Sequence, residues 1–243
     1  AATFKFVATI SGTTNTKVLL VGPAGGVVAQ ASRPLTQRYP HPAWVEQDAG
    51  AIWQSVREAI DECLAAAGDP QLAAIAITNQ RESATLWERA SGRPLGPVVV
   101  WQCRRSADFC ADLRARGLAP WLAERTGLAI DPLFSASKMR WLLDHVPEAA
   151  ALGNRLAFGT IETWLVWHLT GGLHLSDATN ACRTALMPLD GQDWDRGLCE
   201  LFGVPRSALG DITACAGPIG MTSADLFGAA IPITGLAGDQ QSA

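Results

Sequence analysis

The segment Ile231-Pro232-Ile233-Thr234-Gly235-Leu236-Ala237-Gly238-Asp239-Gln240-Gln241 decides the fold of this chain. Its mostly apolar first part predicts a buried strand, and a Gly-Asp-Gln-Gln turn follows that strand. Glycine lets the backbone bend tightly and lets a ligand approach closely. A carboxylate at this point, Asp239, stands where a general base would work at the end of a sheet. A helix should follow and cover the strand, so a sequence that stops just after the turn predicts a second half beyond residue 243.

Composition predicts a globular protein of one large domain or two small ones. The chain has 243 residues, of which 48% are hydrophobic and 17% are charged, so it can bury a sizeable core. The net charge is −4 and no basic run occurs, which argues against a nucleic-acid surface. No apolar stretch reaches about 18 residues, so no membrane span is expected. The first six residues do not resemble a signal peptide.

The cysteines predict neither a metal site nor a disulfide framework. None forms a Cys-x-x-Cys pair, and no histidine stands at zinc-finger spacing. Most of them fall in apolar segments, which favours buried free thiols in a reducing cytoplasm over a metal or disulfide role. The six are Cys63, Cys103, Cys110, Cys182, Cys199 and Cys215.

The element pattern predicts an α/β layered domain with a mixed sheet. Three short strands separated by turn residues open the chain as an antiparallel meander, over Phe4–Ile10, Lys17–Val21 and Gly26–Ser32. An amphipathic helix with Asp48 as its N-cap follows over Ala49–Ala66. Further strands are predicted at Leu72–Thr78, Ala84–Glu88, Pro97–Trp101, Leu173–Leu175 and Ile231–Ala237, the second and third of these joined through Ala90-Ser91-Gly92. Further helices are predicted at Ser106–Arg116, Ala119–Thr126, Ser135–His145, Ile161–Thr170 and Trp194–Phe202. Strands first, then helices alternating with strands, are typical of such layered domains.

Polar clusters follow several of the apolar runs. In Asn79-Gln80-Arg81-Glu82-Ser83, a glutamate that accepts hydroxyl hydrogens stands beside an arginine that donates to hydroxyl oxygens, so the pair can hold a polyol. A solvated loop with a surface ion pair is the alternative. The next cluster is Trp101-Gln102-Cys103-Arg104-Arg105, whose aromatic ring can wall a small ligand. With Asp239 these clusters predict one ligand site, because ligands of open α/β sheets gather at strand ends.

The first turn offers a second kind of site. Gly12-Thr13-Thr14-Asn15-Thr16-Lys17 is rich in small residues, hydroxyls and backbone N–H donors. Such turns can cradle phosphate oxygens, and an ordinary hairpin turn is the alternative.

Five segments together resemble the glycerol-kinase group of the FGGY carbohydrate kinases. They are Ile77-Thr78-Asn79-Gln80-Arg81-Glu82, Val100-Trp101-Gln102-Cys103-Arg104-Arg105, Phe158-Gly159-Thr160-Ile161-Glu162-Thr163-Trp164-Leu165, Thr179-Asn180-Ala181-Cys182-Arg183-Thr184 and Gly235-Leu236-Ala237-Gly238-Asp239-Gln240-Gln241. The likeness runs in order from about residue 6 to the C-terminus. It implies a ribonuclease-H-like (actin-like ATPase) α/β domain, which the family uses twice. Residues 1–243 are then the N-terminal, substrate-binding domain, and the C-terminal nucleotide-binding domain is absent from this chain.

The resemblance also implies roles for individual residues. Arg81 and Glu82 would hydrogen-bond hydroxyls of glycerol, and Trp101 would pack against its carbon backbone. Asp239 would take the proton from the attacking hydroxyl, and Gln240 would hold another hydroxyl. The nucleotide phosphates would face Gly12, Thr13, Thr14, Asn15 and Lys17. ATP and Mg²⁺ are the implied cofactors, with no metal ligand assigned, and the reaction is in-line phosphoryl transfer.

Three positions depart from the family pattern. Ile10 stands where an acidic residue would organise Mg²⁺, and an apolar side chain cannot ligate that ion. Lys17 replaces an arginine and loses its bidentate geometry. Leu133 stands in Asp-Pro-Leu-Phe where glycerol kinases carry a tyrosine, so the substrate is glycerol or a related small polyol.

Two further hypotheses follow from these departures. One is a non-catalytic polyol-binding or regulatory relative, and the other is a fragment that binds nothing tightly. The isolated chain is expected to be inactive as a kinase, the protein is expected in the cytoplasm, and the sequence leaves a homo-oligomer open.

Overall fold

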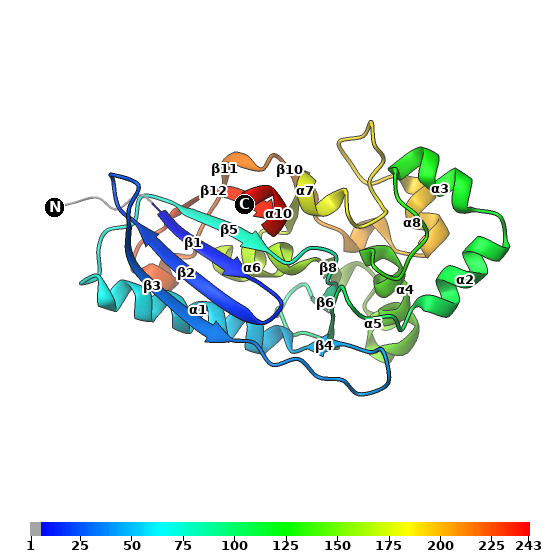
Figure 1. Cartoon of the computed structure of the whole chain (residues 1–243), viewed down its shortest axis with the longest axis horizontal. Coiled ribbons are helices and arrows are strands. Elements are labelled where there is room, and N and C mark those ends of the chain that lie inside the picture. Colours follow the sequence, from blue (N-terminus) through cyan, green and yellow to red (C-terminus); the bar gives the residue numbers. More distant parts are fainter. Residues whose placement is uncertain (1–5) are drawn as a thin grey trace.

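A six-stranded mixed sheet forms one half of the molecule (Figure 1). The computed structural model describes the backbone of residues 6–243 and the side chains from Ser11 onward. In sheet order, the strands are β11 (Ala216–Met221), β12 (Pro232–Gly238), β5 (Ile75–Asn79), β1 (Phe6–Ser11), β2 (Asn15–Val21) and β3 (Val27–Pro34). The first three strands of the chain form the predicted antiparallel meander, which is confirmed from Phe6 on. The predicted start of the first strand at Phe4 lies outside the described residues.

The parallel part of the sheet places the ends of three strands at one edge. β1 and β12 both run parallel to β5, one on each side of it. In this register Asn79 stands opposite Ser11 on one side and opposite Gly238 on the other. Whatever follows these strands in the sequence therefore meets at the same edge.

Two helices cover the sheet and bury the first hydrophobic core. α1 (Ala49–Ala66) has the predicted bounds and packs on β2 and β3, and α6 (Ile161–Thr170) packs beside it near β5. The predicted N-cap is confirmed, because Asp48 Oδ1 accepts a hydrogen bond of 2.9 Å from Ala51 N. The core between helices and sheet includes Leu20, Ile52 and Trp164, all essentially inaccessible to solvent. The apolar stripe of α1 thus faces the sheet, whereas α6 is buried on nearly all its sides.

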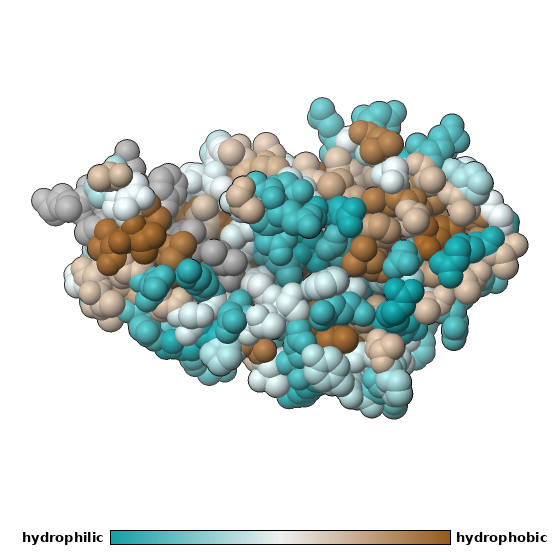
Figure 2. Space-filling view, viewed as in Figure 1, coloured by the Kyte–Doolittle hydropathy of each residue, from teal (hydrophilic) through white to brown (hydrophobic). Residues whose placement is uncertain are grey.

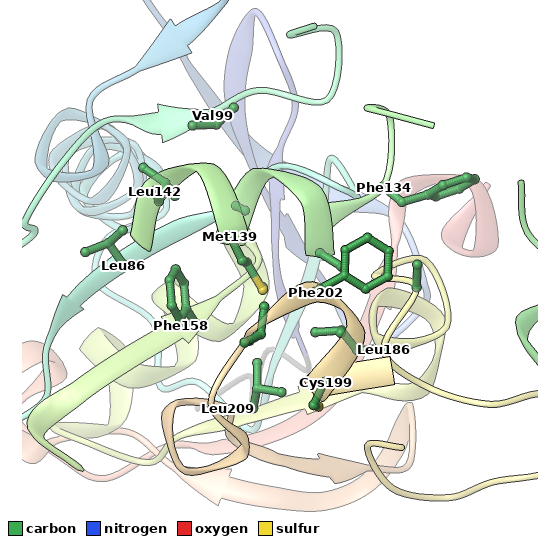
Figure 3. Close-up of a cluster of buried hydrophobic side chains, with 14 of the residues drawn as sticks. Leu86, Val99, Phe134, Met139, Leu142, Phe158, Leu186, Cys199, Phe202 and Leu209 are labelled. Carbon is green, nitrogen blue, oxygen red and sulfur yellow. The ribbon is translucent and has the colours of Figure 1, made fainter. Parts of the chain in front are cut away.

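The other half of the molecule is mainly helical (Figure 1). Its helices are α2 (Ala107–Ala115), α3 (Ala119–Thr126), α4 (Ser135–His145), α5 (Pro147–Leu152) and α8 (Arg196–Phe202). α3 and α4 have the predicted bounds. α8 begins two residues later than predicted, because Asp195 caps it by accepting a 2.7 Å hydrogen bond from Leu198 N. Figure 3 shows Met139 and Leu142 of α4 in the second hydrophobic core, with Phe158 beside them.

The predicted connection of strands 84–88 and 97–101 through the turn at Ala90-Ser91-Gly92 is confirmed, because the two segments run antiparallel with bridges between Ala84 and Val99 and between Trp87 and Pro94. β6 (Thr85–Glu88) pairs with β8 (Leu156–Gly159), and β7 (Val98–Val99) pairs with β4 (Glu46–Gln47). Hydrogen bonds from Leu95 N to Leu86 O at 3.1 Å and from Glu88 N to Arg93 O at 2.9 Å also link the two sides of this hairpin. β8 is four apolar residues long, which is too short to show a period, so the sequence did not reveal this partner.

Several short elements complete the fold. β9 (Leu175–Asp177) begins where the predicted strand 173–175 ends, and it pairs with β10 (Asp211–Thr213). The elements that the sequence did not predict are β4, α5, β8, β10, β11, α7 (Ala178–Ala181), α9 (Ala224–Phe227), α10 (Asp239–Ser242) and the 3₁₀ turns at Gly153–Arg155 and Arg206–Ala208. In the part of the chain that the structure describes, no helix has the length and apolar character needed to cross a bilayer.

Candidate active site

An open pocket of about 270 Å³ lies at the edge where β5 and β12 end. Figure 2 shows hydrophilic residues gathered at the centre of this face, where Figure 1 places α10. All five residues that the sequence proposed as substrate-binding or catalytic belong to the pocket wall. The lining residues are Thr13, Gln80, Arg81, Glu82, Trp101, Leu133, Arg183, Asp239 and Gln240.

Arg81 crosses directly over the backbone of the neighbouring strand. The residue is 7% exposed, and its Nη2 donates a hydrogen bond to Gln240 Oε1. A Cβ atom added to Gly238 would stand 2.2 Å from Arg81 Cδ, so this crossing requires glycine. The arginine therefore belongs to a packed site, and the alternative of a solvated loop is wrong.

Glu82 occupies a tight turn with its own charged partner. The residue has φ of 62°, and Ser83 N donates a 2.7 Å hydrogen bond to Arg81 O across it. Such a left-handed conformation costs a non-glycine residue about 1–3 kcal/mol and marks functional sites. Glu82 Oε1 accepts a 2.6 Å hydrogen bond from Arg183 Nε rather than pairing with Arg81. Arg81 and Glu82 therefore both line the pocket, but each is hydrogen-bonded to a different residue, Arg81 to Gln240 and Glu82 to Arg183.

Arg183 is a pocket residue to which the sequence assigned no role. It follows α7, and its guanidinium carbon lies 4.8 Å from the centre of the Phe134 ring. The signal was present, because Arg183 belongs to the polar segment Thr179–Thr184 of the family resemblance. Its position beside Glu82 depends on folding, since the two residues are 101 positions apart in the chain.

Trp101 ties the pocket to the first turn. The residue is 37% exposed, and its indole Nε1 donates a 2.9 Å hydrogen bond to Thr13 Oγ1. Its backbone N–H donates to Ser83 Oγ at 3.1 Å. Gln80, almost fully buried, donates through Nε2 to Gly12 O at 3.2 Å. These hydrogen bonds therefore fix the indole of Trp101 and the strand end at Gln80 relative to the first hairpin.

The residues proposed for phosphate binding do not all reach this pocket. Thr13 lines it, and Gly12 is linked to it through its carbonyl oxygen. Thr14, Asn15 and Lys17 are exposed on the hairpin and are not among the lining residues. The replacement of an acidic residue by Ile10 concerns a side chain outside the described part of the chain.

Leu133 closes one side of the pocket on a loop pinned by a buried lysine. Lys138 Nζ donates to Pro132 O at 2.7 Å and also to the carbonyl oxygens of Leu133 and Phe134. Burial lowers the pKa of Lys138 to about 7. The sequence placed Lys138 in a helix without a role, because a lysine on an amphipathic helix usually faces solvent.

Two buried carboxylates lie beneath the ends of β5 and β12. Glu162 accepts hydrogen bonds from Ser176 Oγ at 2.6 Å and from Asn79 Nδ2 at 3.1 Å. Burial, together with the nearby charge of Asp177, raises the pKa of Glu162 to about 7. Asp177 accepts a 2.7 Å hydrogen bond from Asn180 Nδ2. The sequence did not identify either carboxylate as part of the site.

Asp239 differs from these two acids because it is exposed. It is the first residue of α10, it lines the pocket, and its Oδ1 accepts a 2.9 Å hydrogen bond from Gln240 N. Such a carboxylate can take a proton from a hydroxyl bound in the pocket. No group of three or more metal-ligating side chains occurs among the residues described. A single protein carboxylate can nevertheless be enough to bind Mg²⁺ when substrate phosphates supply further oxygen ligands.

Comparison with known proteins places this geometry in context. The N-terminal domain of the FGGY family of carbohydrate kinases matches residues 8–243. A glycerol kinase of Cereibacter sphaeroides (strain ATCC 17025) is 47% identical over 239 residues, which cover 96% of this chain and 48% of the relative. A glycerol kinase of Bordetella parapertussis is 48% identical over 237 residues, which cover 96% of this chain and 47% of the relative. The chain thus spans about half the length of these relatives.

Solved structures agree with the fold class. The crystal structure of Plasmodium falciparum glycerol kinase with ADP superposes with a TM-score of 0.94 at 29% identity, covering 99% of this chain and 49% of that one. Xylulose kinase from Rhodospirillum rubrum superposes with a TM-score of 0.87 at 27% identity, covering 96% and 49%. The predicted ribonuclease-H-like, actin-like α/β domain with a mixed sheet is confirmed.

Proposed function

Because this chain belongs to the FGGY family of carbohydrate kinases, we propose that it is the substrate-binding domain of an ATP-dependent polyol kinase. The substrate is glycerol or a related small polyol, which is phosphorylated on a primary hydroxyl. Identity of nearly one half to proteins named glycerol kinase supports this choice of substrate. The nucleotide-binding domain of such an enzyme would lie outside residues 1–243.

The observation that carries the proposal is the composition of the pocket. Arg81 and Gln240 provide hydrogen-bond donors, Glu82 provides an acceptor, and the exposed face of Trp101 provides an apolar wall. A small polyol needs this combination, because it presents hydroxyls on its edges and C–H groups on its faces. The exposed carboxylate of Asp239 stands in the same pocket. A protein that only binds the polyol would not need a general base in the pocket, so we favour a kinase over a non-catalytic polyol-binding relative.

The proposed reaction transfers the γ-phosphoryl group of ATP to a hydroxyl of the polyol. The polyol oxygen attacks the γ-phosphorus of ATP, the bond from that phosphorus to the β-phosphate oxygen breaks, and ADP leaves. Asp239 accepts the proton that the attacking hydroxyl loses. Positioning and charge neutralisation supply most of the rate in phosphoryl transfer. Thr13, hydrogen-bonded to Trp101 at the pocket rim, is the first-turn residue best placed to meet the nucleotide.

The remaining proposals concern cofactor and location. Mg²⁺ would arrive with the ATP phosphates, which supply most of its oxygen ligands. We place the protein in the cytoplasm, and its thiols support this, because all six cysteines are free in the described structure. Four of the six are buried as predicted, whereas Cys182 is exposed and Cys215 is partly exposed.

The decisive experiment removes the base. In a coupled assay of ADP release with glycerol, Mg²⁺ and ATP, Asp239→Asn in the natural full-length protein should lower turnover by roughly 10²- to 10⁴-fold. The matched control is Asp108→Asn, an exposed aspartate on α2 outside the pocket, which should leave turnover unchanged. Residues 1–243 alone should bind the polyol and turn over little of it. Full turnover by Asp239→Asn would refute the assignment.

A further inference from the structure

The backbone N–H of Gly238, the last residue of β12, has a side chain as its hydrogen-bond partner. On one side β12 pairs with β5, where Gly238 stands opposite Asn79. On the other side, β11 pairs with β12 no further than Gly235. α7 packs against β12 beyond that point, and Gly238 N donates a 2.8 Å hydrogen bond to Thr179 Oγ1. A threonine hydroxyl thus takes the place that a neighbouring strand would have.

A buried carboxylate orients that hydroxyl. Thr179 Oγ1 donates its proton to Asp177 Oδ2, so its lone pairs remain to accept from Gly238 N. Asp177 is fully buried, and it also accepts 2.7 Å hydrogen bonds from Thr179 N and Asn180 Nδ2. Cys215 Sγ adds a fourth contact at 3.3 Å. The carboxylate is therefore held from several sides and cannot turn away from the threonine.

The position of Asp239 depends on this anchor more than on contacts of its own. Asp239 is exposed, and the hydrogen bond that its carboxylate accepts comes from the adjacent residue, Gln240. Its helix, α10, has four residues. The backbone just before it is fixed by Thr179 at Gly238 N and by Ser242 Oγ, which donates to Gly238 O at 3.1 Å.

We propose that Thr179 is a positioning residue for the reaction. Its hydroxyl connects the immobile Asp177 carboxylate to the backbone N–H of Gly238. It thereby keeps the Asp239 carboxylate close enough to the attacking hydroxyl for proton transfer. This inference rests on the proposed function, in which Asp239 is the base. Displacing a reacting group by about 1 Å can cost on the order of 10²-fold in rate. The anchor should therefore affect turnover more than it affects polyol binding, because two of the three polyol-binding polar side chains, Arg81 and Glu82, stand on a different segment from Gln240.

The test compares two substitutions of similar size in the natural full-length protein. Thr179→Val keeps the shape and loses the hydroxyl, whereas Thr179→Ser keeps the hydroxyl. We expect Thr179→Val to lower kcat by on the order of 10- to 100-fold with little change in KM for glycerol, and Thr179→Ser to stay near the wild type. Thr179→Ala serves as a second hydroxyl-free variant with the same expectation, in case valine does not fit.

The control is a threonine with the same hydrogen-bond pattern far from the pocket. Thr126 Oγ1 donates to Leu122 O at 2.8 Å and accepts from Leu128 N at 3.1 Å, and the residue is buried. Thr126→Val should lower thermal stability and leave kcat unchanged. A loss of kcat equal to that of Thr179→Val would mean that any buried threonine matters equally, and it would overturn the proposal.

A second readout does not depend on activity. Amide hydrogen exchange of Gly238, measured by NMR on residues 1–243, should be slow in the wild type and in Thr179→Ser and faster in Thr179→Val. If the wild type phosphorylates glycerol and Asp239→Asn does not, normal kcat in Thr179→Val overturns the inference alone. If the wild type phosphorylates no polyol, the proposed function fails, and unchanged Gly238 exchange in Thr179→Val would overturn the anchor independently.

Discussion

Replacing Gly238 by alanine should disable the pocket with little harm to the fold. The backbone at Gly238 has φ of −63° and ψ of 155°, which alanine adopts freely, so the effect must come from the new methyl group. That Cβ would stand 2.2 Å from Arg81 Cδ and 2.7 Å from Arg81 Cγ. Carbon atoms do not approach so closely, and Arg81 must therefore move away from the strand.

The size of the effect follows from what Arg81 loses. Its guanidinium donates to Gln240 Oε1 and lines the pocket, and a displaced side chain gives up that placement. A hydrogen bond to a charged group contributes about 1.5–3 kcal/mol, so glycerol should bind roughly 10- to 150-fold more weakly. Overpacking costs about 1–3 kcal/mol of stability when nothing yields. Here a flexible side chain yields, and the loss should stay near the lower end.

The assay is calorimetric titration of glycerol, with thermal unfolding measured on the same samples. Gly26→Ala is the control, because a Cβ added there meets no atom within 4 Å. In an Arg81→Ala background, Gly238→Ala should not weaken glycerol binding further, because the arginine side chain that the new methyl group would clash with is absent. Wild-type affinity in Gly238→Ala, or an undiminished effect in the Arg81→Ala background, would refute the reasoning.

Two other substitutions test the surroundings of the pocket. Leu133→Tyr restores a hydroxyl and an aromatic wall, so calorimetry should show tighter glycerol binding; weaker binding would mean that the pocket is shaped for a different polyol. Glu162→Gln tests the buried acid, whose pKa is raised from 4.5 to about 7 by burial and by the charge of Asp177. Between these pH values the native state holds a proton that the unfolded chain has released, so the wild type loses stability as pH rises from 4.5 to 7. Glu162→Gln lacks this loss. In denaturant titrations, its free energy of unfolding should therefore rise relative to that of the wild type as pH increases, with a slope approaching about 1.4 kcal/mol per pH unit. A difference in unfolding free energy that does not change with pH would contradict the buried titration.

Local signals in the sequence determined the helices well. The bounds of α1, α3, α4 and α6 agree with those read from the residues. These elements are set by interactions over three or four positions, such as the cap that Asp48 provides and the apolar stripe behind it. The opening meander was predictable for the same reason, because turn residues separate neighbouring strands that pair with each other.

The members of the site were also visible in the sequence, since Arg81, Trp101 and Asp239 each follow an apolar run and carry the family pattern. Their partners were not visible. Arg81 binds Gln240 across 159 positions, Glu82 binds Arg183 across 101, and β6 pairs with the distant strand β8. Contacts at such separations leave no periodic trace in the sequence. They arise because helices and strands pack around two shared cores, which brings distant segments to one edge of the sheet. Only the tertiary structure therefore decided that Glu82 faces Arg183 and that Thr179 holds the backbone before Asp239.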